Sequence, residues 1–280
     1  MSVHEVCVRH LPTFVPIDRL LSPHAFEEVE GAWRASLTTR DAADVQARLR
    51  GRGLGGLPTS VDVDPALPRA AVRHARLVDA RRRRFTTPGF LREGSLLDEE
   101  GRFSLTPEVL ADGLASGTRG RRVFDLGCGA GGNTLAFARA GAEVLAIDRD
   151  RSRLDLARHN ARAYGLEARI EFRHLDVVRH AAALEEEAAV DDALVFVDPP
   201  WGLDWDRLSC TLDALPLLRL VLGGFTGREL LAKVPPSFDP DSTPGLVANA
   251  VFGEAEGDRC HVKFLSLRGR ALAFFARQAL

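Results

Sequence analysis

The sequence carries little net charge and almost no lysine. Its 280 residues have a formal net charge of −2, so no overall electrostatic attraction to nucleic acid is expected, and any such binding must use a local basic patch. Lysine occurs only at Lys233 and Lys263, and all other basic side chains are arginine or histidine. Genome composition explains this bias as readily as function does.

Cysteine is also scarce, and long apolar runs are missing. The cysteines form no CxxC pair and no His/Cys cluster at zinc spacing, so we expect no metal site, and reduced thiols in a cytoplasmic protein. No segment resembles a signal peptide, and no apolar run approaches the roughly 20 residues that cross a bilayer. A role in the membrane is therefore not expected.

The rest of the composition is that of an ordinary globular protein, with 45% hydrophobic and 27% charged residues. This length suits one large α/β domain with a small appendage. We place an N-terminal helical appendage at residues 1–97 and the main domain at residues 98–280. Three helices are predicted in the appendage: from Ser22-Pro23 through Phe26, Val29 and Trp33, from Asp41 to about Leu49, and from Asp64-Pro65 to Arg84.

A cluster of arginines closes the last of these helices. Arg81, Arg82, Arg83 and Arg84 follow Arg69, Arg73 and Arg76. Two interpretations stay open. The cluster is either a solvated helix end, which the helix dipole favours, or a phosphate-binding face for an RNA or nucleotide substrate.

From residue 122 onward, apolar segments alternate with helix-like segments. Strands are expected at 122–126, 143–148, 169–173, 193–198 and 229–234, with helices around 131–140, 151–163, 179–187 and 207–221. This alternation predicts an α/β fold with a mostly parallel sheet covered by helices on both faces. Residues 262–275 predict a closing antiparallel element, in which two strands are joined by a turn at 268–270.

A glycine-rich turn follows the first strand of the main domain. In Asp125-Leu-Gly127-Cys-Gly129-Ala-Gly131, the glycines let the backbone approach a ligand, and the next helix begins facing that ligand. Dinucleotide oxidoreductases use a similar turn. The acidic residue before the first glycine favours S-adenosylmethionine instead, because its carboxylate can receive the amino group of the methionine part.

Acidic residues also end the next two strands. Asp148 follows the turn by about 20 residues, the distance at which a carboxylate reaches ribose hydroxyls. Asp176 closes the third strand and can accept from the adenine amino group. Each aspartate alone is equally explained as a helix cap. Three of them at successive strand ends, beside the switch point of an open sheet, favour a cofactor site.

The segment Asp198-Pro199-Pro200-Trp201 follows the fourth strand and indicates the chemistry. The exocyclic amine of a purine is a poor nucleophile, so its lone pair must be localised and aimed at the methyl group. The Asp198 carboxylate and the Pro199 carbonyl, held by consecutive prolines, can accept its two N–H groups. Trp201 offers a flat face for the ring. Trp205 either closes the other face or anchors a loop, and a strand-end turn with a core tryptophan is the structural alternative.

These motifs resemble those of the trimethylguanosine synthase family, the RNA cap guanine-N2 methyltransferases. The similarity runs from about Arg82 to about Asp241. The matching segments are 103–108, 128–134, 146–148, 156–161 with Tyr164-Gly165, and 199–202. The resemblance implies that Ser104, Thr106, Asn133 and Thr134 lie at the cofactor, Asp148 at its ribose, Asp176 at its adenine and Trp201 on the guanine.

Two positions depart from the family pattern. Serine is usual where this chain has Asp198, which moves the motif toward Asp-Pro-Pro-aromatic enzymes that methylate purine amines in nucleic acid. The Arg-Asn pair that the family uses near the cap stands where this chain reads Pro235-Pro236-Ser237-Phe238. The methyl-transfer chemistry is therefore better supported than a charged 5′ cap as substrate.

We expect a class I, Rossmann-like methyltransferase that uses S-adenosylmethionine to modify the exocyclic amine of a purine, most of all guanine N2, in RNA or a nucleotide-like molecule. Two alternatives stay open: the same chemistry on a free metabolite, and a module that binds cofactor or RNA without catalysis. The intact segment from Asp198 to Trp201 argues against the second. The number of methyl groups added and the oligomeric state stay open.

Overall fold

The computed structural model describes residues 2–11, 20–50, 59–85, 89–201, 206, 208–226, 228–235, 237–243, 246–252 and 262–267. The chain divides into two compact units, the first built mainly on residues 1–86 and the second mainly on residues 87–251. The first unit contains the arginine cluster, and the second contains the glycine turn.

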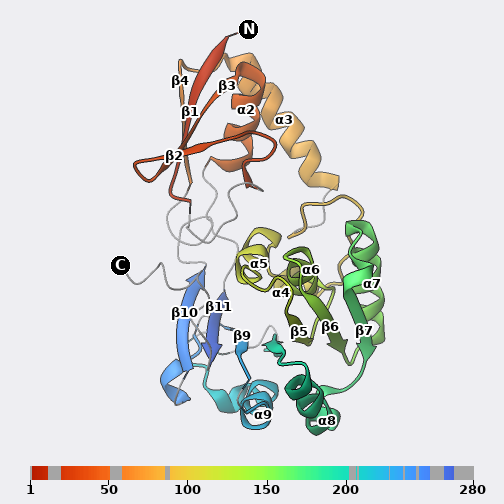
Figure 1. Ribbon diagram of the computed structural model, residues 1–280. Helices are drawn as coiled ribbons and strands as arrows, with labels where there is room; N and C mark the ends of the chain where they lie inside the picture. The colour runs from red at the N-terminus through yellow and green to blue at the C-terminus, as the bar shows by residue number, and fades with distance from the viewer. Residues whose placement is uncertain are drawn as a thin grey trace. The chain divides into compact units, whose positions relative to one another are not determined.

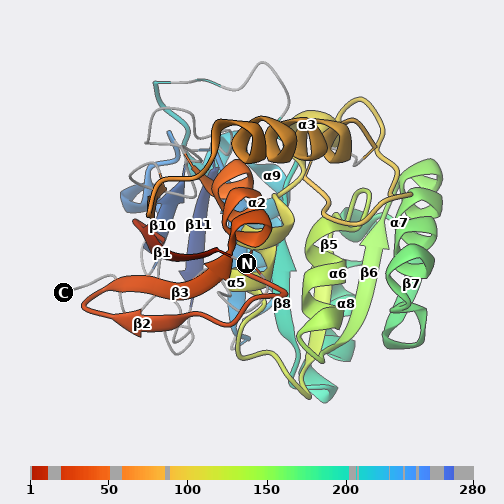
Figure 2. The ribbon, with the colours of Figure 1, turned by 90° about the horizontal axis from the view of Figure 1, so that it is seen from above.

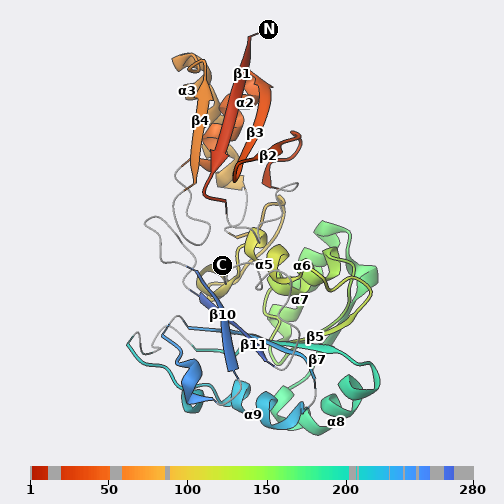
Figure 3. The ribbon, with the colours of Figure 1, turned by 60° about the vertical axis from the view of Figure 1, so that its left-hand side comes forward.

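In its described residues, the first unit combines an antiparallel sheet with two helices (Figure 1). Its elements are β1 (Val3–Arg9), β2 (Glu27–Val29), β3 (Ala32–Thr38), α2 (Thr39–Leu49), β4 (Ser60–Asp64) and α3 (Arg69–Phe85). The strands lie in the order β2-β3-β1-β4, which can be followed in Figure 3. Val6 and Val8 are buried between exposed neighbours along β1, so one face of the sheet is covered. α2 buries Val45 and Leu49 and packs against α3 (Figure 2).

The prediction of a purely helical appendage is therefore wrong. The helix expected from Ser22 does not form, because these residues lead into the β2–β3 hairpin. Its turn residues Glu30 and Gly31 both have positive φ, at 52° and 72°, the conformation that matches the twist of a two-stranded hairpin. Val29 and Trp33, whose spacing looks helical, belong instead to β2 and β3.

The two other predicted helices form, one of them with a different start. α2 occupies its predicted place, and the Thr38 side chain caps it by accepting from the Asp41 N–H at 3.3 Å. α3 begins at Arg69 rather than at Asp64, because the residues before it pair with β1 as strand β4. The arginine cluster does lie on a helix, as predicted.

The second unit is built on a seven-stranded sheet in the order β10-β11-β9-β8-β5-β6-β7. Its strands are β5 (Arg122–Leu126), β6 (Glu143–Asp148), β7 (Ile170–His174), β8 (Leu194–Val197), β9 (Leu230–Val234), β10 (Leu246–Phe252) and β11 (Val262–Leu267). Strands β5 to β9 run parallel, and β11 runs antiparallel to β9. The predicted parallel sheet and the first closing strand are confirmed. The turn and strand predicted after residue 267 lie outside the described residues.

Helices cover both faces of this sheet, with α5, α6 and α7 on one side and α8 and α9 on the other (Figures 1 and 3). The helices are α4 (Gly101–Ser104), α5 (Glu108–Leu114), α6 (Gly132–Arg139), α7 (Arg151–Tyr164), α8 (Val177–Val190) and α9 (Pro216–Gly224). α9 begins at Pro216 rather than near residue 207, since proline suits the first turn of a helix and breaks its interior. β5 lies between β6 and β8, and in open α/β sheets ligands bind at the carboxyl ends of the strands beside such a switch in strand order.

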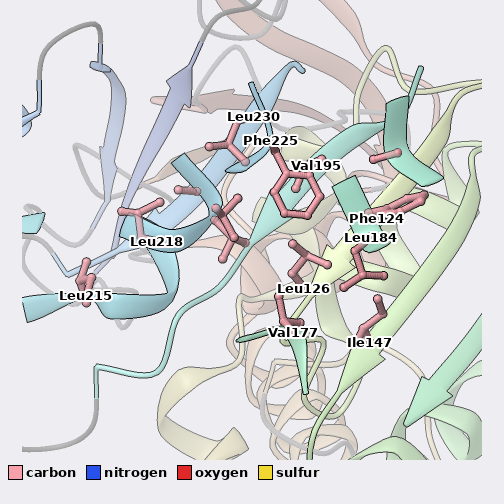
Figure 4. Packing of buried hydrophobic residues seen from close by; sticks show 14 of the residues in the cluster. Phe124, Leu126, Ile147, Val177, Leu184, Val195, Leu215, Leu218, Phe225 and Leu230 are labelled. Atoms are coloured by element: carbon pink, nitrogen blue, oxygen red, sulfur yellow. The ribbon is translucent and has the colours of Figure 1, made fainter. Parts of the chain in front are cut away.

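The main hydrophobic core lies between the sheet and helices α8 and α9 (Figure 4). Phe124 and Leu126 of β5 pack there together with Leu218 of α9. Burying a side chain of this size stabilises the fold by about 1.5–3 kcal/mol. Because side chains alternate along a strand, Asp125 and Lys233 point to the opposite face of the sheet. Both polar residues are fully buried there.

Candidate active site

The glycine turn joins β5 to α6 in a conformation that favours glycine. Gly127, Gly129 and Gly131 have φ values of 91°, 53° and 89°. Neighbouring atoms also leave little room: a Cβ on Gly127 would lie 3.0 Å from the Asp198 carbonyl oxygen, and one on Gly131 would lie 3.1 Å from the Ala157 Cβ. The turn therefore lies against the strand end that carries the predicted catalytic segment.

Leu105 holds the segment before α5 against the same turn. A Cβ on Gly132 would lie 2.5 Å from Leu105 Cδ1, and a Cβ on Gly89 would lie 2.5 Å from Cδ2 of the same leucine. The leucine thus fills space that two glycines, distant in sequence, leave open. The Thr106 carbonyl oxygen would lie 3.7 Å from the Gly132 Cβ, so Thr106 is placed beside the start of α6.

Asp148 ends β6 and binds the backbone of the turn. Its Oδ2 accepts from the Gly129 N–H at 2.8 Å, and its Oδ1 accepts from the Asp150 N–H at 2.8 Å. The residue is buried, so the carboxylate helps to shape the turn. Each oxygen keeps a lone pair for a further donor, such as a hydroxyl group.

Asp125 lies just before the turn and is completely buried. The Thr134 hydroxyl donates to its Oδ2, whereas its Oδ1 has no hydrogen-bond partner. Burial raises the pKa of Asp125 from 3.8 to about 7, against the opposing effect of the Thr134 hydrogen bond. A positively charged ligand group would give Oδ1 a partner and favour the ionised carboxylate.

Three predicted cofactor residues carry buried polar atoms that lack a hydrogen-bond partner in the described part of the chain. These atoms are Asp125 Oδ1, Thr106 Oγ1 and Asn133 Oδ1. Leaving such an atom unpaired costs roughly 1–3 kcal/mol. The three come from β5, from the segment before α5 and from the first turn of α6. Unpaired polar atoms from these segments fit a site that a polar ligand completes.

Asp176 is the N-cap of α8. It accepts from the Val178 N–H at 2.9 Å, and its Oδ2 lies 3.6 Å from Arg179 Nε. The helix-cap reading of this aspartate is thus realised. Asp176 also lines a hollow of about 820 Å³ with Arg149 and His174, next to the ends of β6 and β7. It keeps its place as a candidate at the outer end of the cofactor site.

Asp198 follows β8 and forms an ion pair with Lys233 of β9. The Lys233 Nζ donates to Asp198 Oδ2 at 2.8 Å and to the Ser104 carbonyl oxygen. The lysine side chain is 0% exposed and that of Asp198 is 19% exposed. Burial raises the pKa of Asp198, and Lys233 opposes this rise. The predicted acceptor for the amine is thus engaged through one of its two oxygens.

Trp201 is half-buried at the same place. Its ring centroid lies 5.2 Å from the Lys233 Nζ, within the range of a cation–π interaction, and its side chain packs against the main core. Part of the Trp201 indole is therefore covered by the protein, and part of it is accessible to solvent. Pro199 is buried and Pro200 is exposed. Trp205 lies outside the described residues.

Other residues of the sequence motifs support the turn from behind. Asn160 of α7 is buried and donates through Nδ2 to the carbonyl oxygens of Ala130 and Leu96, at 2.8 Å and 2.9 Å. Glu108 of α5 accepts from the Tyr164 hydroxyl. Burial, followed by this hydrogen bond, raises the pKa of the Tyr164 hydroxyl. These polar residues fix the loops around the glycine turn.

The arginines predicted to bind substrate belong to the first unit. Arg81 is exposed on α3, and the side chains of Arg82, Arg83 and Arg84 lie outside the described part. Three further arginines of α3 line a hollow of about 420 Å³ with apolar neighbours: Leu67, Arg69, Val72, Arg73, Arg76 and Leu77. Within the described residues, none of these exposed arginines takes part in an ion pair.

Sequence reasoning missed Lys233. A signal was present, because a lysine in the middle of the apolar strand Leu230–Val234 must be buried with a partner. Its partners Ser104 and Asp198 are 129 and 35 residues away in the chain. No local spacing rule could name them.

The structure describes three of the cysteines, and one of them, Cys128, lies in the glycine turn. Cys7, Cys128 and Cys210 are free thiols, and burial raises the pKa of both Cys128 and Cys210. Among the described residues, no group of three or more His, Cys, Asp or Glu side chains could hold a metal ion. The same residues include no helix with the length and apolar character to span a membrane.

Comparison with known proteins confirms the resemblance seen in the motifs. Residues 120–206 match the RNA cap guanine-N2 methyltransferase family. The trimethylguanosine synthase of Schizosaccharomyces pombe is 34% identical over 115 residues, which cover 39% of this chain and 47% of that protein. That of Saccharomyces cerevisiae is 30% identical over 105 residues, which cover 36% and 33%. The chain thus spans less than half the length of these two curated relatives.

A solved structure supports the fold of the chain. A possible methylase from Clostridium difficile 630 superposes with a TM-score of 0.53, over 95% of this chain and 98% of that one. The sequences are 13% identical, so the likeness concerns the fold alone. The Rossmann-like class I architecture predicted from the alternating pattern is confirmed.

Proposed function

We propose that this chain is an S-adenosylmethionine-dependent methyltransferase and that it methylates the exocyclic N2 amine of guanine in RNA. One observation carries the proposal. The segment from Asp198 to Trp201 is anchored by Lys233, and the Asp198 carbonyl oxygen lies where a side chain on Gly127 would be. The cofactor turn and the predicted amine-binding segment therefore form one continuous surface.

The residues around the turn fit the cofactor. S-adenosylmethionine supplies, when bound, a methyl group on a positively charged sulfur atom. We assign its amino group to Asp125, its ribose hydroxyls to Asp148 and its adenine to Asp176. The unpaired polar atoms of Thr106 and Asn133 are further contacts. The remaining residues assigned to the cofactor site contribute through their backbone or support the residues that contact the cofactor: Ser104, Gly127, Gly129, Gly131 and Thr134.

The acceptor end is assigned to four consecutive residues. The second oxygen of Asp198 accepts one N–H of the amine, and the Pro199 carbonyl, held by Pro200, accepts the other. Trp201 stacks on the ring, an interaction worth roughly 1–3 kcal/mol per base. Localising the lone pair in this way orients it toward the methyl group, and positioning of two bound reactants can supply about 7–11 kcal/mol of the barrier reduction.

RNA as the carrier of the guanine is supported by α3. Its exposed arginines, including Arg69, Arg73 and Arg76, are without ion pairs in the described residues, and arginine readily contacts phosphate oxygens. Leu67 and Leu77 beside them give the hollow an apolar wall. We assign the hollow and Arg81 to Arg84 to the RNA strand, and Trp205 to the neighbourhood of the base.

The experiment that tests the function is product identification. The protein is incubated with labelled S-adenosylmethionine and total RNA, capped RNA or free guanine nucleotides, and the products are digested to nucleosides. We expect label in N2-methylguanosine from RNA. Label on adenine overturns the choice of base, and label only with free nucleotides favours the metabolite alternative. An Asp198→Asn protein serves as the catalytic control.

A further inference from the structure

Lys233 is an unusual residue for the interior of a sheet. β9 lies between β8 and β11, and each of its residues is buried. The Lys233 side chain is 0% exposed, and its ammonium group contacts Asp198, the Ser104 carbonyl and the ring of Trp201. One buried cation thus joins a segment assigned to the cofactor with two residues assigned to the acceptor.

Stability alone does not explain this lysine. Moving an ammonium group out of water costs several kcal/mol, which the ion pair and the hydrogen bond to Ser104 offset. Replacing a buried ion pair by neutral groups of similar volume is often neutral or stabilising. A charge at this position therefore points to a role in the site.

On the basis of the proposed function, we propose that Lys233 is a positioning residue that keeps Asp198 ionised and fixes it beside Trp201 for binding of the amine. With Oδ2 of Asp198 bound to Lys233, Oδ1 is the oxygen that remains for the substrate. The hydrogen bond from Lys233 to the Ser104 carbonyl oxygen links the ion pair to a segment assigned to the cofactor. Lys233 itself need not touch either substrate.

The charges around Asp198 make its ionisation strongly dependent on Lys233. Three acidic groups also act on it: Asp125 of β5, Asp148 of β6 and Glu100 before α4. These carboxylates and burial all favour a proton on Asp198, and among them Lys233 is the opposing cation. A protonated Asp198 loses a negative acceptor for the amine.

The test follows the ionisation of Asp198 without any methyl acceptor. The protein has three tryptophans, so Trp33→Phe and Trp205→Phe leave Trp201 as the single reporter. Its fluorescence is titrated with pH in this background, with Lys233→Met and with Lys233→Arg. We expect Lys233→Met to raise the midpoint by roughly 1–3 pH units, since an opposite charge lowers a carboxyl pKa by that amount. Lys233→Arg keeps the charge and the original midpoint.

An unchanged midpoint in Lys233→Met overturns the proposal. If this variant does not fold, Asp198→Asn combined with Lys233→Met removes both charges and leaves no isolated buried ion. That protein is expected to fold and to lose the transition; a transition that persists belongs to another group and also overturns the proposal. Because no RNA is used, this result stands apart from the identity of the methyl acceptor.

The kinetic readout connects the pair to methyl transfer. In single-turnover reactions, the acidic limb of the pH–rate profile should move upward with Lys233→Met, while affinity for S-adenosylhomocysteine stays unchanged. An equal loss of rate at every pH indicates a purely structural role and contradicts the assignment.

Discussion

Three arginines of helix α3 differ in their surroundings from many arginines of the second unit. In the second unit, arginines form ion pairs with carboxylates, as Arg139 does with Asp112 and Arg173 with Glu187. In the first unit, Arg69, Arg73 and Arg76 of α3 are exposed without an ion pair in the described residues. Many arginines of the second unit are thus neutralised by neighbouring carboxylates, whereas these three arginines of α3 leave positive charge exposed. An average net charge near zero hides this division.

The same contrast applies to buried groups inside the second unit. Most charged side chains there have partners, but Asp125 Oδ1 has none. Asp125 Oδ1 and the three arginines of α3 are both assigned to a ligand.

The largest effect is expected for Asp198→Asn. The amide keeps the shape and can still accept from Lys233, but it loses the negative charge, so turnover should fall on the order of 10²–10³-fold. Affinity for S-adenosylhomocysteine, measured by calorimetry, should not change. If both fall together, Asp198 serves the cofactor. Alanine is a poorer choice, because it leaves the buried lysine without a partner.

Asp125→Asn should stabilise the protein at neutral and higher pH. The folded-state pKa of Asp125, about 7, lies above its ordinary value of 3.8, so the folded state retains a proton that the unfolded state has lost. The stabilising contribution of Asp125 is fully present below pH 3.8 and is lost as the pH rises through about 7. Asparagine does not titrate, so the substitution removes this loss. The gain in the free energy of unfolding is up to about 4 kcal/mol, at about 1.4 kcal/mol per pKa unit.

Urea unfolding at about pH 4 and about pH 8 measures this difference. The gain should be present at the higher pH and nearly absent at the lower one. Asp150→Asn is a control of opposite sign, since hydrogen bonds at the start of α7 lower the pKa of Asp150. A gain for Asp125→Asn that does not change with pH contradicts the assignment of a raised pKa.

Reversing the charges of the α3 arginines should weaken RNA binding by about 10–100-fold. The variant replaces Arg69, Arg73 and Arg76 by glutamate, which removes phosphate contacts and lowers the salt dependence of log K by about 2 for a single strand. Turnover at saturating RNA should persist.

The matched control for this variant changes the same number of charges in the second unit. Arg162, Arg169 and Arg219 are exposed and already paired with carboxylates. Their reversal to glutamate should leave RNA affinity nearly unchanged. Equal losses in both variants mean that only net charge matters, and they remove α3 as a specific surface.

The smallest effect is expected for Arg162→Met. Arg162 is 64% exposed and pairs with Glu167, and such surface pairs contribute about 0–1 kcal/mol. Thermal unfolding should show a change near the limit of measurement. Arg139→Met should cost more, because Arg139 is 19% exposed and pairs with two nearly buried carboxylates, Asp112 and Glu108.

The sheet and the glycine turn could be predicted because their signals are local. β5, β6 and β9 are short apolar runs, and the glycines between Asp125 and Asn133 lie within one turn. The first unit was harder. The spacing of Phe26, Val29 and Trp33 suits a helix, and only the turn at Glu30 and Gly31 indicates that the chain reverses into a hairpin.

The site could be predicted as a set of residues but not as a network. Asp148 and Asp198 lie at the strand ends where the parallel pattern places them. That Asp148 accepts from the turn, and that Lys233 binds Asp198, depends on strands brought together only in the sheet. Asp176 differs from these two residues, because its role as the N-cap of α8 could be predicted from the local sequence and is observed in the structure.

Leu105 also has an evolutionary consequence. Its two methyl groups occupy the places where Gly89 and Gly132 lack a side chain. A bulkier residue at position 132 is compatible only with a smaller one at 105, whereas the positive φ of Gly89 favours glycine there whatever residue 105 is. Positions 105 and 132 should therefore covary among orthologues, so that an alignment shows glycine at 132 wherever 105 is large.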